Sequence, residues 1–314
     1  MKKKMAVLAA VASVLLLTLA ACGSGNEEPG NEKSGKIKVV TTIAQIAEPI
    51  SVIGGDYVTV ESLMGPGVDP HLYNATQGDI QKLSGGDLIL YSGLHLEGNM
   101  AEVFQQIGKT RPVVAIAEVI PVDQLLHDGN GAVDPHVWFD IDHWKLALDA
   151  ATQELKKLAP DHAEQFESNK SDYFNELDAL KAEGQTKLSQ ISKEKRVLVT
   201  AHDAFGYFGR AYDMEVVGLQ GLSTEAEIGL SDIDDTIAIL LQHKVPAVFI
   251  ESSINPNSIN AVIEGAASKG LTVKLGGELF SDAMGDAGTP EGTYIGMYRH
   301  NIDTIYEALL EKGE

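Results

Sequence analysis

The chain has 314 residues, more than one hydrophobic core usually serves, so we expect two domains of about 130 residues each. Its content of 44% hydrophobic and 22% charged residues is typical of a soluble globular protein and excludes a disordered or membrane-embedded chain. With 45 acidic against 24 basic residues, the net charge of −21 leaves little basic surface for phosphate, so nucleic acid is excluded as a partner.

Residues 1–21 are typical of an export signal. Three lysines precede an apolar run from Met5, and the run ends in the sequence LAAC at Cys22. This ending resembles the bacterial lipobox, in which the cysteine receives a diacylglycerol after cleavage. An uncleaved membrane anchor is the alternative, although the run is slightly short for a bilayer-spanning helix of about 20 residues. Cys22 is the only cysteine and has no disulfide partner, so we expect lipidation. Cleavage removes three lysines and no acid, which takes the net charge from −21 to −24.

Residues 22–36 are rich in Gly, Ser, Asn and Glu and predict a flexible tether. From Ile37 onward, short apolar runs alternate with amphipathic stretches. The strand candidates of the first half are Lys38–Thr42, Val58–Leu63, Asp87–Tyr91 and Val113–Ala117. Those of the second half are Arg196–Thr200, Glu215–Leu219, Ala247–Glu251 and Thr272–Leu275. Helix candidates between them include Asn99–Ile107, Asp232–His243 and Ser258–Lys269.

This alternation predicts an α/β fold. Continuous aliphatic runs are typical of parallel strands that are buried on both faces. Residues 160–192 contain no strand signal, and their apolar side chains follow the three/four spacing of a helix about 45 Å long, with Gly184 the one weak point. We therefore expect two lobes, 37–159 and 193–314, each a mainly parallel four-stranded sheet flanked by helices. One long backbone helix joins them and limits domain closure.

Four polar side chains follow the predicted strands. His71 lies in a Gly/Pro loop after the second strand, and His136 follows the fourth strand after a longer loop. His202 comes directly after Arg196–Thr200, and Asp282 follows the last strand. Ligands of open α/β sheets bind beyond the carboxyl ends of the strands. Since each half supplies two of these residues, they can converge only in a cleft between the halves.

Three imidazoles and one carboxylate are suitable ligands for a divalent transition metal. His71 and His136 both follow the sequence VDP, and a proline fixes its own φ and extends the residue before it. Such a loop presents its histidine stiffly. The remaining histidines are interpreted as surface or packing residues, because a lone loop histidine usually is one. They are His95, His127, His143, His162, His243 and His300.

Segments along nearly the whole mature chain resemble the solute-binding lipoproteins of bacterial manganese/zinc ABC importers, the TroA-type metal receptors. The segments are MGPGVDPHLY, DLILYSGLHLEGNM, DPHVWFD, RVLVTAHDAFGYF, VVGLQGLSTEAE, FIESS, GGELFSDAMG and EGTYIGMYRHNIDTI. The resemblance implies two α/β lobes joined by a backbone helix, with one metal ion held between them by His71, His136, His202 and Asp282. It also implies an ABC importer permease and its ATPase as partners. The protein is then an extracytoplasmic monomer attached to the membrane through Cys22.

The choice of metal stays open between Mn²⁺ and Zn²⁺. The best-known manganese receptors of the family have Glu at the third ligand position, where this chain has His202. Dedicated zinc receptors have a long His-rich loop before the second ligand, but here residues 118–133 contain only His127. Ligand softness favours zinc. The subgroup with this ligand pattern is associated with both metals, and we favour manganese as the cargo, with zinc binding at least as tightly in vitro.

Ligating histidines usually donate their second ring N–H to a carboxylate or carbonyl. Glu251, at the end of its strand, is the first candidate for this role, with Asp140 and Asp203 as weaker ones and a helix cap as the alternative for Glu251. A secreted zinc hydrolase is the competing function, but the chain has no HExxH motif and four protein ligands would leave no open position on zinc. The third candidate is an adhesin-like lipoprotein, as a secondary role.

Overall fold

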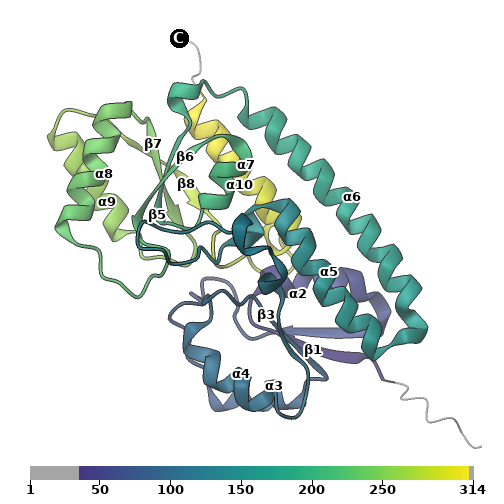
Figure 1. Cartoon of the computed structure of the whole chain (residues 1–314). Helices are drawn as coiled ribbons and strands as arrows, with labels where there is room; N and C mark the ends of the chain where they lie inside the picture. Colours follow the sequence, from purple (N-terminus) through teal and green to yellow (C-terminus); the bar gives the residue numbers. More distant parts are fainter. Residues whose placement is uncertain (1–34, 311–314) are drawn as a thin grey trace, which may run out of the picture. The chain divides into compact units, whose positions relative to one another are not determined.

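The computed structural model describes residues 35–310. The predicted export signal, Cys22 and most of the predicted tether therefore lie outside the described residues. From Lys36 onward the chain forms one compact unit (Figure 1). Within residues 35–310, none of the helices combines the length and the apolar composition that crossing a bilayer requires.

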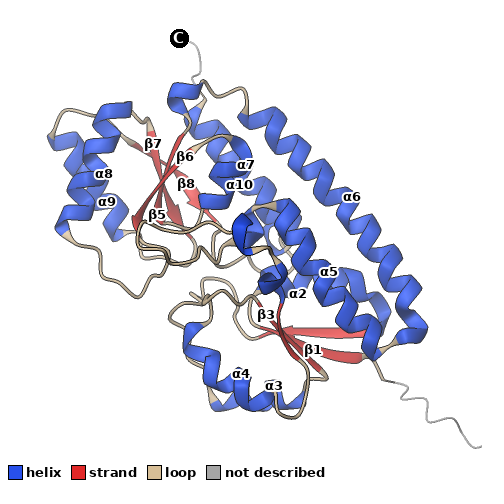
Figure 2. Cartoon of the chain, in the orientation of Figure 1, coloured by secondary structure: helices blue, strands red, loops and turns tan. Residues whose placement is uncertain are grey.

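The first half is a parallel sheet with the strand order β2-β1-β3-β4. Its strands are β1 (Ile37–Thr41), β2 (Val58–Ser62), β3 (Leu88–Tyr91) and β4 (Val113–Ala115). Helices cover both faces of this sheet, as Figure 2 shows. They are α2 (Ala44–Gly54), α3 (Gln77–Gly85), α4 (Ala101–Ile107) and α5 (Ile141–Leu158). The parallel four-stranded sheet that the buried apolar runs predicted is confirmed here.

The second half also contains four parallel strands, but its sheet differs from the prediction. The strands are β5 (Val197–His202), β6 (Glu215–Gln220), β7 (Ala247–Glu251) and β8 (Lys274–Leu279). They form two hydrogen-bonded pairs, β5-β6 and β7-β8, with β5 packed beside β7. Apolar runs predict strands and their burial, whereas they carry no information on whether two packed strands approach closely enough to share a hydrogen-bonded ladder. The helices are α7 (Gly206–Tyr212), α8 (Leu230–His243), α9 (Asn257–Ser268) and α10 (Tyr294–Leu309).

A single long helix, α6 (Ala163–Leu188), runs between the halves and packs against α2, α5 and α10 (Figure 1). Its 26 residues give a length of about 39 Å. It is shorter than the predicted span 160–192, because Pro160–His162 form a separate 3-10 turn. Gly184, the predicted weak point, lies where the helix closely approaches its neighbours. A Cβ at this position would lie 2.8 Å from the Tyr212 hydroxyl and 2.9 Å from Ile302.

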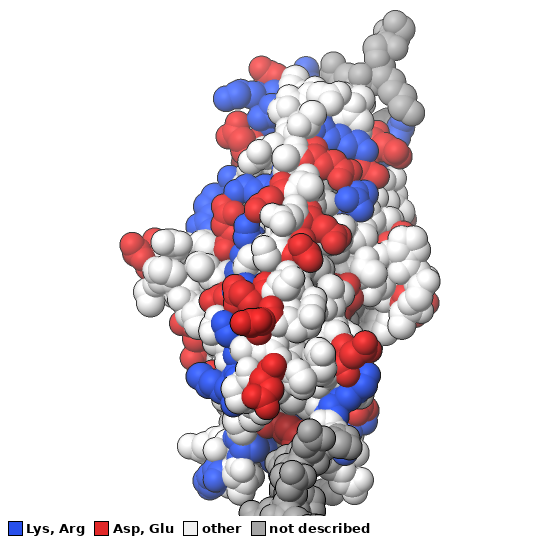
Figure 3. Space-filling view, turned by 90° about the vertical axis from the view of Figure 1, so that its right-hand side faces the viewer, with Lys and Arg blue, Asp and Glu red and all other residues white. Residues whose placement is uncertain are grey.

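Acidic and basic side chains alternate over the face that α6 helps to form (Figure 3). Several of them pair across helices: Lys181 with Asp142 of α5, Lys187 with Asp303 of α10, and Glu183 with Arg299 of α10. Exposed pairs of this kind contribute little each, typically about 0–1 kcal/mol. They hold the register of α6, while buried apolar contacts provide its stability.

One hydrophobic core continues through both halves. It includes strands of the first sheet, helices α2, α5, α6 and α10, and side chains of the second half such as Leu198, Phe249 and Leu279. A smaller core lies on the other face of the second half, under α8 and α9. Because the main core is shared, no boundary separates independent lobes at 159/160 or 192/193 by packing alone. Those boundaries stay predictions.

Candidate metal centre

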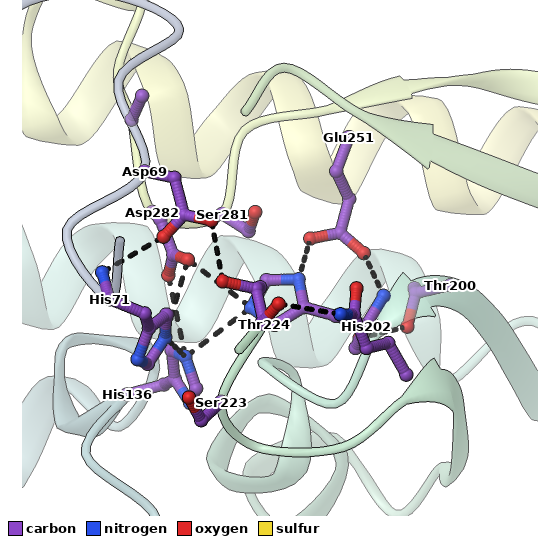
Figure 4. A network of polar contacts seen from close by, with 12 residues as sticks. Asp69, His71, His136, Thr200, His202, Ser223, Thr224, Glu251, Ser281 and Asp282 are labelled. Atoms are coloured by element: carbon purple, nitrogen blue, oxygen red, sulfur yellow. Dashed lines mark hydrogen bonds and ion pairs between the residues drawn. The ribbon is translucent and has the colours of Figure 1, made fainter. Parts of the chain in front are cut away.

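The four residues singled out in the sequence meet at one point. His71, His136, His202 and Asp282 each offer a ligand atom, and these atoms all lie within 4.8 Å of one another (Figure 4). All four are buried, with exposed fractions of 4%, 0%, 0% and 1%. The two halves thus bring two residues each to one buried cluster.

The distances between the donor atoms match the edges of a small coordination polyhedron. Nε2 of His136 lies 3.4 Å from Nε2 of His71 and 3.4 Å from Nε2 of His202. Asp282 places Oδ1 3.3 Å from His136, and Oδ2 3.5 Å from His71 and 3.3 Å from His202. A tetrahedron with metal–ligand bonds of about 2.0–2.1 Å has edges of about 3.3–3.4 Å. The cluster therefore has the size of a transition-metal site.

The elements explain why these side chains converge. His202 is the last residue of β5, and Asp282 lies just beyond the end of β8. His71 lies in the loop that follows β2, and His136 precedes the 3-10 turn Val137–Phe139 that leads into α5. Carboxyl ends of parallel strands open onto a common crevice. Here loops that follow strands of both halves meet at the cluster.

The two VDPH segments form the same local turn. The backbone N–H of His71 donates to Oδ1 of Asp69 at 2.9 Å, and that of His136 donates to Oδ1 of Asp134 at 2.9 Å. An aspartate that accepts the N–H two residues ahead closes an Asx turn. The sequence reasoning used only the proline of this repeat and missed the aspartate, although the repetition of all four residues was the signal.

Carboxylates lie behind two of the three histidine rings. Oδ1 of Asp134 lies 2.7 Å from Nδ1 of His136. Oε2 of Glu251 lies 2.5 Å from Nδ1 of His202 as an ion-pair contact, and Oε1 accepts the backbone N–H of His202 at 2.8 Å. A carboxylate at Nδ1 favours the tautomer that leaves the lone pair of Nε2 free for a metal. Glu251 thus lies where the sequence reasoning expected it, and Asp134 was missed.

The weaker candidates for this role lie elsewhere. Asp140 caps α5 by accepting the backbone N–H groups of Asp142 and His143, and it pairs with Arg210. Asp203, although next to His202, lines a separate acidic pocket beside β6 with Asp232. Neither prediction is supported by the contacts in the described part of the chain, because the Nδ1 positions of His136 and His202 are already taken by Asp134 and Glu251.

His71 is held through its backbone by a loop of unusual conformation. Asn99 donates from Nδ2 to the His71 carbonyl at 3.1 Å. Upstream in the same loop, Gly93, Leu94 and His95 all have positive φ (87°, 54° and 68°), which is costly for the two non-glycine residues. The buried carboxylate of Glu97 holds this turn by accepting from Thr42 Oγ1 and from the backbone N–H of Ser92 and Gly93. Burial raises the pKa of Glu97 despite these bonds.

The other histidines that were interpreted as surface or packing residues lie outside the cluster. His95 is exposed, His143 is 3.1 Å from the Gln124 side chain, and His162 stacks on Tyr57 with ring centroids 3.7 Å apart. Within residues 35–310, the group of His71, His136, His202 and Asp282 is the one set of His, Cys, Asp and Glu side chains with spacing suited to a metal ion.

The charges of the cluster are strongly coupled. Burial lowers the pKa of His71 to about 4, against the opposing attraction of Asp282. Burial acts in the same direction on His136, but hydrogen bonds to Asp134 and Asp282 outweigh it and raise its pKa to about 9. The pKa of His202 is raised well above its usual value, against burial, by Glu251 and Asp282. The pKa of Asp282 is held well below its usual range, again against burial, by His202 and His136. A divalent cation bound at the centre would replace the protons that these interactions attract.

Comparison with known proteins reveals close similarity over the whole described region. Residues 39–308 match the family model ZnuA, the zinc-uptake complex component A, periplasmic. The chain is 49% identical over 300 residues to the manganese-binding lipoprotein MntA of Bacillus subtilis (strain 168), covering 95% of this chain and 98% of that protein. It is 51% identical over 275 residues to the zinc-binding protein TroA of Treponema pallidum (strain Nichols), covering 88% and 89%.

One solved structure and a more distant sequence relative agree with these matches. The periplasmic zinc-binding protein TroA from Treponema pallidum superposes with a TM-score of 0.87 at 50% identity, covering 88% of this chain and all of that chain. A more distant relative, the manganese ABC transporter substrate-binding lipoprotein PsaA of Streptococcus mitis, is 30% identical over 301 residues, covering 94% of this chain and 95% of that protein. The similarity thus extends through both halves and the long helix between them.

Proposed function

The chain belongs to the ZnuA family of periplasmic metal-uptake components, and from this we propose that it is an extracytoplasmic receptor that captures one Mn²⁺ or Zn²⁺ ion and delivers it to an ABC importer. The ligands are His71, His136, His202 and Asp282. The observation that carries this proposal is the spacing of their donor atoms, 3.3–3.5 Å between neighbours in a buried cluster. A metal receptor needs such a closed set of ligands, assembled from both sides of a crevice.

The protein is a binding protein and not an enzyme. Its relatives are named as manganese-binding and zinc-binding proteins and as a substrate-binding lipoprotein of an ABC transporter. Catalytic zinc sites keep one position for water or substrate next to three protein ligands. Here four side chains point at the same centre, and both oxygens of Asp282 face histidine nitrogens. The alternative of a secreted zinc hydrolase therefore has no support.

Anchoring and partners follow from the same family. We propose that the mature protein begins at a lipidated Cys22, is extracytoplasmic and lipid-anchored to the bacterial membrane, and acts as a monomer. Relatives named as lipoproteins of metal transport systems support this location. The partners are then a membrane permease and the ATPase that drives it. The acidic balance of the chain, −21 overall, agrees with a protein that handles cations rather than nucleic acid.

The cargo is the finer part of this proposal. The relative named for manganese and the relative named for zinc are 49% and 51% identical to this chain, so family likeness does not separate the two metals. Three imidazoles and one carboxylate bind zinc more tightly than manganese, because zinc stands above manganese in the general order of divalent affinities. We propose manganese as the physiological cargo, selected by availability, and zinc as an at least equally tight ligand in vitro.

The test is metal binding by the purified chain. We expect one Mn or Zn ion per chain by elemental analysis without chelator, and a rise in Tm when metal is added, because a ligand that binds only the folded state stabilises it. His202→Ala should abolish that rise. His243→Ala, at the end of α8 in the same half, is the matched control and should leave it unchanged. Equal rises in both variants and the wild type would place the site elsewhere.

A further inference from the structure

The carboxylate of Asp282 contacts the three histidines of the cluster, and its position otherwise depends on its backbone. Both of its oxygens are buried without a hydrogen-bond donor among the described residues, apart from the contacts with the ligand histidines. Two of the three histidines have a carboxylate contact at their second ring nitrogen: Asp134 lies at Nδ1 of His136, and Glu251 lies at Nδ1 of His202. The place of the only carboxylate in the cluster therefore depends on what holds residues 280–283.

Two of the contacts on this segment come from its own half of the chain. Asn301 of α10 accepts the backbone N–H of Phe280 at 2.9 Å and donates to its carbonyl at 2.7 Å. Ser252, which follows β7, donates from Oγ to the Ala283 carbonyl at 3.2 Å. These bonds fix the two ends of the segment but do not reach its centre.

The centre is held from the opposite half. The carbonyl oxygen of Ser281 accepts two side-chain donors, Nε2 of Gln45 at 3.1 Å and Nε1 of Trp138 at 3.2 Å. Gln45 lies in α2, and Trp138 lies in the 3-10 turn directly after His136. Both side chains and Ser281 are fully buried. Figure 4 shows Ser281 directly beside Asp282.

The orientation of Gln45 supports a specific role for its donor. Its Oε1 is buried and has no hydrogen-bond partner in the part of the chain that the structure describes, and turning the amide around would place that oxygen against the Ser281 carbonyl. Among residues 35–310, the hydrogen bond of this amide is therefore the one to Ser281. A buried amide with half of its capacity unused is costly, so its retention in the core calls for such a role.

We propose that Gln45 and Trp138 are positioning residues that fix Asp282 to the first half of the molecule through the Ser281 carbonyl. The inference deepens the proposed function and rests on it. His71, His136 and Asp282 then act as one preassembled set of three ligands, and His202 is the ligand that the second half contributes independently. Losing either donor lets Asp282 retreat from the metal, which weakens binding through faster dissociation rather than slower capture.

The experiment compares three variants with a matched control. Trp138→Phe keeps an aromatic ring and removes only the Nε1 donor, Gln45→Leu keeps most of the volume and removes the amide, and the double variant removes both donors. Tyr298→Phe is the control, because Tyr298 is fully buried in the same aromatic cluster and donates to the neighbouring Phe139 carbonyl at 2.8 Å, whereas the donors described for residues 280–283 are other side chains.

The readouts are the rate of Mn²⁺ dissociation in a chelator chase, the Mn²⁺ affinity, and the visible spectrum of the Co²⁺-loaded protein. Outer contacts of metal sites are typically worth 10–100-fold in affinity. We therefore expect dissociation about 10-fold faster in each single variant and about 100-fold faster in the double variant, with a changed Co²⁺ spectrum. Tyr298→Phe should lower the Tm of the metal-free protein by about as much as the single donor variants do. It should leave the Mn²⁺ dissociation rate and the Co²⁺ spectrum unchanged.

Wild-type dissociation rates and spectra in the donor variants would overturn the inference while leaving the proposed function intact. An equal acceleration in Tyr298→Phe would overturn it as well, because the effect would then be general loosening of the core. Failure of the wild-type protein to bind Mn²⁺ or Zn²⁺ at all would instead overturn the proposed function.

Discussion

The two VDPH segments have the same four residues and the same turn, but they connect to different parts of the molecule. In Val133–His136, Asp134 is 2% exposed and contacts both the backbone N–H and the ring of His136. In Val68–His71, Asp69 closes the same turn, but its second oxygen accepts from Thr224 Oγ1 at 2.5 Å, across the crevice in the other half. One aspartate orients a ligand, and the other connects the halves.

The electrostatic consequences differ accordingly. Asp134 and Asp282 together raise the pKa of His136 to about 9, whereas burial outweighs Asp282 at His71 and lowers its pKa to about 4. A local sequence motif therefore determines a turn, and the tertiary partner of its aspartate determines what the histidine does. As candidate ligands, His136 is fixed and basic, whereas His71 is neutral.

Removing each aspartate in turn tests this difference most strongly. We expect Asp134→Ala to weaken Mn²⁺ binding by about 10–100-fold, because His136 loses the acceptor that fixes its tautomer and ring. Asp69→Ala should cost less than about 10-fold in affinity, since His71 keeps the bond from Asn99 to its carbonyl. Competition titrations of both variants measure the ratio. Equal losses of Mn²⁺ affinity in the two variants would show that the two aspartates contribute equally to binding.

The pH dependence of the metal-free protein sharpens the contrast. A pKa of about 9 for His136, above the usual 6.5, adds stability that is complete below pH 6.5 and is lost as the pH rises through 9. A pKa of about 4 for His71 has the opposite sign, so stability is lost as the pH falls from 6.5 through 4. We therefore expect the Tm to be highest near pH 6–7 and to fall on both sides, by roughly 5–10 °C.

NMR titration of the histidine ring protons assigns the two sides of that curve. The signal of His136 should titrate on the alkaline side and that of His71 below pH 5. Mn²⁺ affinity should rise with pH over the range in which His136 loses its proton, because metal and proton compete for the ring. A common pKa near 6.5 for both rings would remove the electrostatic difference between the two segments.

The smallest expected effect concerns the contact across the crevice. Thr224→Val keeps the shape of the side chain and removes the hydroxyl that donates to Asp69. We expect Mn²⁺ to dissociate about three- to tenfold faster, because one intramolecular hydrogen bond typically contributes about 0.5–1.5 kcal/mol. Thr236→Val is the control, because the Thr236 hydroxyl donates within α8 to the Asp232 carbonyl and does not reach the crevice. Similar rates in both variants and the wild type would show that Asp69 and Thr224 do not hold the crevice closed.

The positions of the four candidate ligands could be predicted because they depend on a rule of topology. Side chains that follow parallel strands gather at one edge, and His202 and Asp282 follow β5 and β8 closely. Periodicity also located the long helix, although Pro160 set its start later than expected. The contacts that position the candidate ligands could not be predicted by such a rule. Gln45 acts on a backbone carbonyl 236 positions away, and no side-chain pattern records such a partner.

The role of the repeated VDPH motif could be predicted only in part. Its proline and histidine could be interpreted locally, and its aspartate forms a bond only two residues long in both copies. What the sequence did not contain is the second partner of each aspartate, since Thr224 and the His136 ring are brought there by folding. The division of the second-half strands into two pairs could not be predicted either, because it depends on how closely β5 approaches β7 in the folded chain.

The hydrophobic core that runs without interruption through both halves has a mechanical consequence. A hinge needs a plane across which few apolar contacts are broken, but here side chains such as Tyr298 of the second half pack against Phe139 of the first half within one continuous core. Swinging one half away from the other would expose them to water, at about 25 cal/mol for each Å². Under the proposed function, we therefore expect the metal ion to enter and leave through small shifts of the loops around the cluster, and not through rotation of one half away from the other.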